Sequence, residues 1–203
     1  MDRVQTRAGR HWTDRAPGAL LVVGLSLAVL WLVEIVDTVL GHRLDAYGIR
    51  PRVVDGLDGI AFAPFLHAGF SHLLANSTSF AILGVVAYMA VNALRFFGVI
   101  VVSAVTSGFG AWLFGAVGTV VVGASGVIFG LLGFLLVRGF IERRVGAIAV
   151  SVAVLLLYGT ALLGVLPGAP HVSWQGHLFG FAGGVLAAWV LRQRRRRCAT
   201  TTR

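Results

Sequence analysis

Two side chains that can cooperate in hydrolysis stand inside apolar stretches of this sequence, where polar groups are costly. Ser125 opens one apolar run, directly after Gly123 and Ala124, and His177 lies in a later one. A neutral imidazole can take the proton of a serine hydroxyl at neutral pH and so activate it as a nucleophile. Since no acidic residue is near His177 in the sequence, the pattern predicts a catalytic Ser–His dyad without a third carboxylate.

Groups that could stabilise an oxyanion accompany this pair. His72 and Asn76 are four residues apart, so they share a face if their segment is a helix. Both side chains can donate a hydrogen bond to a developing negative charge, as can the backbone N–H of Ser125. Gly123 and Gly126 flank the serine without bulk, which leaves backbone N–H groups free to face a reacting carbonyl.

The composition defines the class of protein in which these residues act. Of the 203 residues 57% are hydrophobic and only 12% are charged, against about 25% in ordinary soluble domains. These values exclude a soluble globular enzyme and a disordered chain, and the single cysteine, Cys198, excludes a disulfide scaffold. All basic residues are arginines clustered between apolar runs, which is typical of membrane topology rather than of a nucleic-acid-binding face.

Six apolar runs predict an all-α membrane protein with a six-helix bundle. They cover residues 19–40, 72–92, 96–115, 125–137, 145–166 and 174–191. We expect an N-terminal tail at 1–18, a membrane domain at 19–191 and a basic C-terminal tail at 192–203. Six crossings put both termini on one side, together with 14 of the 17 arginines. The positive-inside rule therefore predicts cytoplasmic termini, and the residue usage suggests a prokaryotic plasma membrane.

Depth estimates bring the polar groups to one layer. Counted from Arg138 and Arg192 at the inner surface, Ser125 and His177 lie roughly 20 Å and 22 Å deep, and Asn76 is close to that level. The fourth run is short for a crossing helix. Residues 116–124 are therefore expected to enter the membrane as a re-entrant loop that lines a water-filled cavity.

Small residues predict that the fourth and sixth runs touch. Ser125, Phe129 and Gly133 share one helical face, and His177, Gly180 and Gly184 share another. Small side chains let two helix backbones approach closely in a membrane. Such an approach would bring the imidazole of His177 to the hydroxyl of Ser125.

Three motifs in this order resemble those of the rhomboid intramembrane serine proteases, over about residues 20–191. They are Gly123-Ala124-Ser125-Gly126, His72-x-x-x-Asn76 and His177-x-x-Gly180-x-x-x-Gly184. The resemblance implies a rhomboid-like fold and cleavage of a substrate's transmembrane helix near its outer end, through an acyl-enzyme. It assigns Ser125 as nucleophile, His177 as base and acid, and His72, Asn76 and the Ser125 amide as oxyanion donors. Two features depart from the family: Phe129 replaces a frequent tyrosine, and the first loop lacks a Trp–Arg pair.

Other readings remain open at this stage. A small transporter or channel could use Glu34, His72 and His177 as relay groups, and a catalytically silent rhomboid-like protein could bind membrane helices. Glu34 and Asp37 could relay protons, but a structural pairing with Arg43, Arg50 or a backbone donor of the first loop is the preferred interpretation.

The expected partners are single-span membrane-protein substrates and the lipid bilayer, with no nucleic acid. A metal site built from His67, His72 and His171 matches no ligand signature, so no metal and no cofactor are expected. Cys198 is expected to be an unmodified thiol, with palmitoylation as the alternative.

Overall fold

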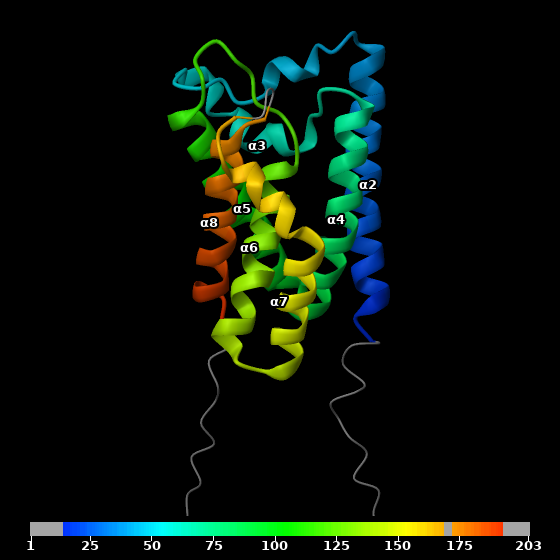
Figure 1. The fold of residues 1–203 in the computed structure, drawn as a ribbon. Coiled ribbons are helices and arrows are strands. Elements are labelled where there is room, and N and C mark those ends of the chain that lie inside the picture. Colours follow the sequence, from blue (N-terminus) through cyan, green and yellow to red (C-terminus); the bar gives the residue numbers. More distant parts are fainter. Residues whose placement is uncertain (1–13, 169–171, 193–203) are drawn as a thin grey trace, which may run out of the picture.

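The computed structural model describes residues 14–168 and 172–192, and this part of the chain is helical without a strand. The predicted tails, together with His171 and Cys198, lie mostly or wholly outside it. Six longer helices are connected by short helical turns (Figure 1). The longer ones are α2 (Ala16–Val39), α4 (Phe70–Ala90), α5 (Ala93–Phe114), α6 (Ser125–Glu142), α7 (Val145–Tyr158) and α8 (Trp174–Val190). The short ones are η1 (Leu44–Tyr47), η2 (Val54–Gly56), α3 (Gly59–Phe62), η3 (Ala63–Phe65) and η4 (Gly159–Val165).

Five helical segments of the described chain are long and apolar enough to cross a membrane. They are α2, α4, α5, α6 and the continuous segment of α7 and η4, Val145–Val165. The predicted multi-pass helical membrane protein is thereby confirmed. The sixth predicted crossing, α8, is also apolar but has only 17 residues.

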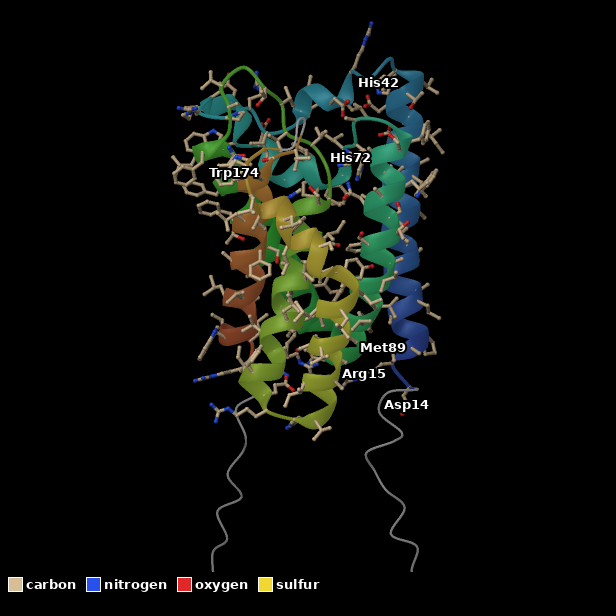
Figure 2. All side chains as sticks on the ribbon, in the orientation of Figure 1. Asp14, Arg15, His42, His72, Met89 and Trp174 are labelled. Atoms are coloured by element: carbon tan, nitrogen blue, oxygen red, sulfur yellow. The ribbon has the colours of Figure 1, made fainter. Side chains whose placement is uncertain are left out.

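The long helices run side by side as an elongated bundle, with α2 at one edge and α8 at the other (Figure 1). The connections 40–69 and 115–124 gather at one end, which we call the loop end. Figure 2 shows His42, His72 and Trp174 toward this end, and Asp14, Arg15 and Met89 at the opposite one. There the Arg15 guanidinium donates to the carbonyls of Met89 and Val91, and so ties the start of α2 to the end of α4.

Helix α6 forms the centre of the bundle and contacts α4, α5, α7 and α8. Within an apolar stretch of 18 residues, 61% of the residues are buried in α6, against 22% in α2 and 11% in Val145–Val165. Leu131, Leu132 and Leu135 are almost completely buried. A helix that is apolar all round is suited to such a central position, and this position fixes the residue at its first turn, Ser125.

Two predicted boundaries were wrong. Helix α6 does not end near residue 137 but continues to Glu142, so the idea that it is unusually short is wrong as well. Arg138 Nε donates to Glu142 Oε1 at 2.7 Å, one turn apart, and this pair lets the helix run through the charged cluster. Arg143, with a left-handed φ of 51°, ends it. Helix α2 starts at Ala16, earlier than expected, with a proline in its first turn.

Candidate active site

Ser125 and His177 are hydrogen-bonded to each other. Nε2 of His177 lies 2.9 Å from Oγ of Ser125. Ser125 is the first residue of α6, and His177 lies in the first turns of α8, where the Ser173 hydroxyl caps the helix by accepting from the N–H of Gly176. The structure therefore brings the two predicted side chains together from the loop ends of two neighbouring helices.

The approach of α6 and α8 depends on glycines. A Cβ on Gly180 would run into the backbone of Gly126, and one on Gly184 into the backbone of Gly130. A Cβ on Gly133 would come within 2.5 Å of the carbonyl oxygen of Phe181 on α8. With no side chain between the backbones, the two helices lie close enough for the imidazole to reach the hydroxyl directly.

The second ring nitrogen of His177 determines its tautomer. Nδ1 lies 3.0 Å from the carbonyl oxygen of Gly164 in η4. Since a carbonyl only accepts, Nδ1 carries the hydrogen in the neutral ring, and Nε2 is left to accept the proton of Ser125. A Cβ on Gly164 would lie 3.3 Å from Nδ1 and 3.0 Å from Cζ of Phe129, so a larger residue would crowd this contact.

Phe129 supports the imidazole from one side. Its ring is stacked on that of His177, with centroids 4.1 Å apart and planes inclined by 12°. Phe129 lies one turn after Ser125 on the same face of α6. One face of α6 therefore provides the Ser125 hydroxyl, the ring that supports His177 and the contact with α8.

His72 and Asn76 lie against the backbone that leads into Ser125. Gly123 has a left-handed φ of 119°, and a Cβ there would meet Cε1 of His72 at 2.6 Å. Only glycine fits such a close approach and such a φ. Asn76 is 6% exposed, and its Nδ2 has no hydrogen-bond partner among the described residues. The first N–H groups of α6 have no intrahelical acceptor either, so several donor groups converge beside the serine.

These groups line one cavity of about 860 Å³. Ser125, His177, His72, Asn76 and Gly123 all contribute to its wall. Trp174 lines it too, and like His72 it lies toward the loop end (Figure 2). A cavity with these polar groups on its wall can hold water beside the hydroxyl.

Sequence reasoning missed three features of the site. Gly130 could have been found from its spacing of four residues from Gly126, a small-xxx-small pattern. The carbonyl of Gly164 had no signal, because any residue carries one. His67 was considered only for a metal site, yet it is 0% exposed, and its ring centroid lies 5.3 Å from that of His72. Burial, and secondly the charge of His72, lower the pKa of His67 to about 4, so it is neutral at pH 7.

The acidic residues of α2 fulfil only half of the preferred interpretation. Oδ1 of Asp37 accepts from the backbone N–H of Leu44 in the first loop at 2.7 Å, as predicted. The predicted pairing of Glu34 was wrong, because neither of its carboxylate oxygens has a hydrogen-bond partner among the described residues. Glu34 faces inward on α2 at 1% exposure, and no arginine forms an ion pair with it among the described residues.

A sequence model of the Rhomboid domain matches residues 56–194. The chain belongs to the rhomboid family. The predicted resemblance is thereby confirmed. This rhomboid is similar to the Mycobacterium tuberculosis protein Rv1337, with 44% identity over 173 residues that cover 81% of this chain and 72% of the relative.

Two further relatives extend the comparison. The Bacillus subtilis protein YdcA, whose name places it with the rhomboid proteases, is 31% identical over 171 residues, covering 83% of this rhomboid and 79% of YdcA. RHOMBOID-like protein 4 of Arabidopsis thaliana is 35% identical over 150 residues, covering 69% of this rhomboid and 36% of the plant protein.

Proposed function

We propose that this rhomboid is a serine endopeptidase that cleaves transmembrane helices of other membrane proteins with a Ser125–His177 dyad. One observation carries the proposal: Oγ of Ser125 lies 2.9 Å from Nε2 of His177, while Nδ1 of the same ring faces the Gly164 carbonyl at 3.0 Å. A positioned base with its unprotonated nitrogen on a hydroxyl is what nucleophilic catalysis by serine requires.

The reaction runs in two halves. Oγ of Ser125 attacks the substrate's peptide carbonyl carbon while Nε2 of His177 takes the hydroxyl proton. The resulting imidazolium gives this proton to the leaving amine, the C–N bond breaks, and an acyl ester remains on Ser125. Water then attacks the ester carbon and loses its proton to Nε2. When the C–O bond breaks, that proton returns to Oγ, and a carboxylic acid is released.

The oxyanion of each tetrahedral intermediate would be held by His72, Asn76 and the N–H of Ser125. Two observations support this assignment: Nδ2 of Asn76 has no hydrogen-bond partner among the described residues, and His72 lies close to Gly123. Donors of this kind are worth about 3 kcal/mol each in hydrolases.

Phe129 keeps the stacking function of an aromatic ring at this position, and close backbone approach is provided by Gly123, Gly126, Gly133, Gly180 and Gly184.

We also propose a placement in the bilayer that is consistent with this fold. Helix α8 would be a sixth crossing, since 17 residues span about 26 Å against a hydrocarbon core of about 30 Å. Both termini would then lie in the cytoplasm with most of the arginines, and the loop end would face outward.

Residues 116–124 would enter the outer part of the membrane as a re-entrant loop. The N–H groups of Val121 and Ile49 donate to each other's carbonyls at 2.9 Å, and Gly123 N–H donates to Ala63 at 2.9 Å. Irregular backbone is tolerated at membrane depth when protein satisfies its polar groups in this way.

Substrates would be single-span helices that reach the cavity from the lipid. The segment Val145–Val165 is the least buried of the candidate spans, at 11%, and is therefore the helix that can move aside for entry. A helical peptide bond is shielded by its own hydrogen bonds and side chains. We therefore expect cleavage near small or helix-breaking residues, and little cleavage of a stable poly-leucine helix.

The test combines a fluorophosphonate probe with a panel of single-span substrates. Wild-type protein should be labelled at Ser125 and should cleave substrates, whereas Ser125→Ala and His177→Ala should do neither. Ser79→Ala is the matched control, since Ser79 lines the same cavity but should retain both activities. Wild-type protein without labelling and cleavage, as a transporter or a silent helix binder predicts, would overturn the proposal.

A further inference from the structure

Three acidic side chains meet at the loop-end terminus of α2, in a cluster that the dyad does not use. Glu34 and Asp37 lie about one turn apart on α2, each 1% exposed, and Asp45 joins them from η1. Both oxygens of Glu34, Oδ2 of Asp37 and Oδ1 of Asp45 are buried without a hydrogen-bond partner among the described residues. Ionised carboxylates are costly to bury unless a positive charge accompanies them.

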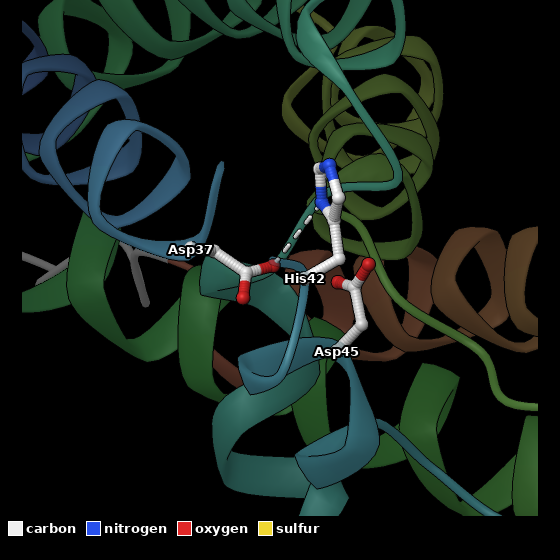
Figure 3. Close-up of side chains that lie close together, drawn as sticks. All are labelled: Asp37, His42 and Asp45. Carbon is white, nitrogen blue, oxygen red and sulfur yellow. Dashed lines mark ion pairs between the residues drawn. The ribbon is translucent and has the colours of Figure 1, made fainter. Parts of the chain in front are cut away.

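The chain that leaves α2 folds an imidazole onto this cluster. Gly41 and His42 both have left-handed φ values, 69° and 60°, so the loop reverses sharply after the helix. Nδ1 of His42 then lies 3.7 Å from Oδ2 of Asp37. Figure 3 shows the imidazole beside the carboxylates of Asp37 and Asp45. One ligand atom each from Asp37, His42 and Asp45 lies within 4.8 Å of the other two.

No arginine neutralises these carboxylates within the part of the chain that the structure describes. The two ion pairs found there are Asp37 with His42 and Arg138 with Glu142. Burial, followed by the negative charge of Asp37, raises the pKa of Asp45, while His42 opposes the shift. The cluster thus concentrates negative charge that has no fixed cationic partner.

We propose that Asp37, His42 and Asp45 bind a first-row divalent metal ion such as Zn²⁺, with Glu34 as a further carboxylate beside it. Carboxylate oxygens and an imidazole nitrogen form a ligand set that Zn²⁺ uses at about 2.0 to 2.2 Å. Tetrahedral coordination at this length places neighbouring ligand atoms about 3.4 Å apart. The ligand atoms lie within 4.8 Å of one another, so side-chain movement would bring them closer around the ion, and His42, with its side chain 51% exposed, leaves a route for the ion from solvent.

The bound ion would fasten the first loop to α2. Asp37 already accepts from the backbone of Leu44, and the metal would add Asp45 of η1 to the same anchor. An ion that binds only the folded protein stabilises it by mass action. From the sequence, no metal ligands were considered among these residues and no metal was expected, so the proposal departs from that expectation.

The test uses full-length protein without a histidine tag, stripped with EDTA and placed in lipid nanodiscs. Zn²⁺ is titrated by calorimetry, and the metal content after dialysis is counted. We expect about one specific ion per chain, and at least tenfold weaker binding in Asp37→Asn, Asp45→Asn and His42→Ala. Asp58→Asn is the matched control: it removes an exposed acid from the same loop, outside the cluster, and should bind Zn²⁺ like wild type.

Thermal unfolding provides a second measurement. Zn²⁺ should raise the midpoint of wild type and of Asp58→Asn, but not that of Asp45→Asn or His42→Ala. These two variants carry the test if Asp37→Asn does not fold, because both change loop residues that are not fully buried.

Three outcomes would overturn the proposal. The first is no binding by wild type at about 1 mM Zn²⁺. The second is equal affinity in wild type, Asp45→Asn and His42→Ala, which would place the ion elsewhere. The third is binding of Ca²⁺ but not of Zn²⁺ or Mn²⁺, since Ca²⁺ is bound by oxygen ligands and not by an imidazole nitrogen.

Discussion

Helices α7 and α8 both pack against α6, but they do so by different means. Helix α8 places Gly180 and Gly184 directly on the backbone of α6, with no side chain between them. Helix α7 contacts α6 through Ala147, Ser151 and Val154, its only buried residues, and the segment Val145–Val165 is only 11% buried. One neighbour of α6 is therefore tightly fixed, and the other is largely exposed.

The two helices contribute different properties to the candidate dyad. The distance between Ser125 and His177 is set by the glycine contacts between α6 and α8. The tautomer of His177 is set by the Gly164 carbonyl, which comes from η4 at the end of α7. The proposed activation of Ser125 would therefore depend on a rigid contact for the Ser125–His177 distance and on a loosely packed segment for the tautomer of His177.

The largest effect is expected from breaking the tight contact. Gly184→Leu would force a side chain into the backbone of Gly130 and push α8 away from α6. We expect a loss of about 3 kcal/mol or more in the free energy of unfolding, together with loss of fluorophosphonate labelling. Gly146→Ala on α7, where a Cβ meets nothing within 4 Å, is the control and should lose neither. Unfolding by SDS in mixed micelles measures the difference, and normal labelling of Gly184→Leu would contradict the assigned role of the contact.

Acidification tests whether the loop before α4 is packed as tightly as the contact between α6 and α8. The folded-state pKa of His67 is about 4, below its ordinary value of 6.5. The unfolded chain therefore takes up this proton first, and the stability present above pH 6.5 is lost as the pH falls toward 4. We expect a loss of about 2 kcal/mol at pH 5. His67→Phe should remove this part of the slope in unfolding measured at pH 7 and pH 5. An unchanged slope would mean that His67 is hydrated in the folded protein.

An intermediate effect is expected at Phe129, which lies between α8 and η4. Its ring stacks on His177 of α8 and also lies beside Gly164 of η4. Phe129→Ala should lose about 1 kcal/mol of support for the imidazole, or about fivefold in the rate of probe labelling. Phe129→Tyr keeps the ring and should label within about twofold of wild type. Equal loss in both variants would show that the stacking is not what orients the base.

The smallest effect is expected from weakening the contact between α6 and α7. Ser151 of α7 donates to the Leu135 carbonyl at 2.7 Å and accepts from the N–H of Gly139 at 3.1 Å, both on α6. Hydrogen bonds between membrane helices are worth about 0.6 kcal/mol, so Ser151→Ala should cost about that in SDS unfolding and leave labelling unchanged. Ser26→Ala is the control, because the Ser26 hydroxyl donates to the Val22 carbonyl within its own helix. A labelling defect in Ser151→Ala would mean that α7 also holds the dyad distance.

Side-chain patterns made part of this site predictable. The spacing of Ser125, Phe129 and Gly133 and that of His177, Gly180 and Gly184 indicated two facing surfaces, and the structure brings those surfaces together. The helix boundaries were less predictable, because the pairing of Arg138 with Glu142 extended α6 through a charged cluster that looked like its end. The two groups stabilise each other once helical, which no single residue type reveals.

Residue types and their periodicity by themselves determined the helical membrane class and the hydroxyl and imidazole available for chemistry, and three motifs indicated the family by resemblance. The tertiary structure alone decided that the Gly164 carbonyl sets the tautomer, that His67 is buried behind His72, and that His42 returns to Asp37. The physical reason is that apolar and small side chains mark which face of a helix is buried. A backbone carbonyl is the same in every residue, and a loop reversal is defined only by the elements it joins.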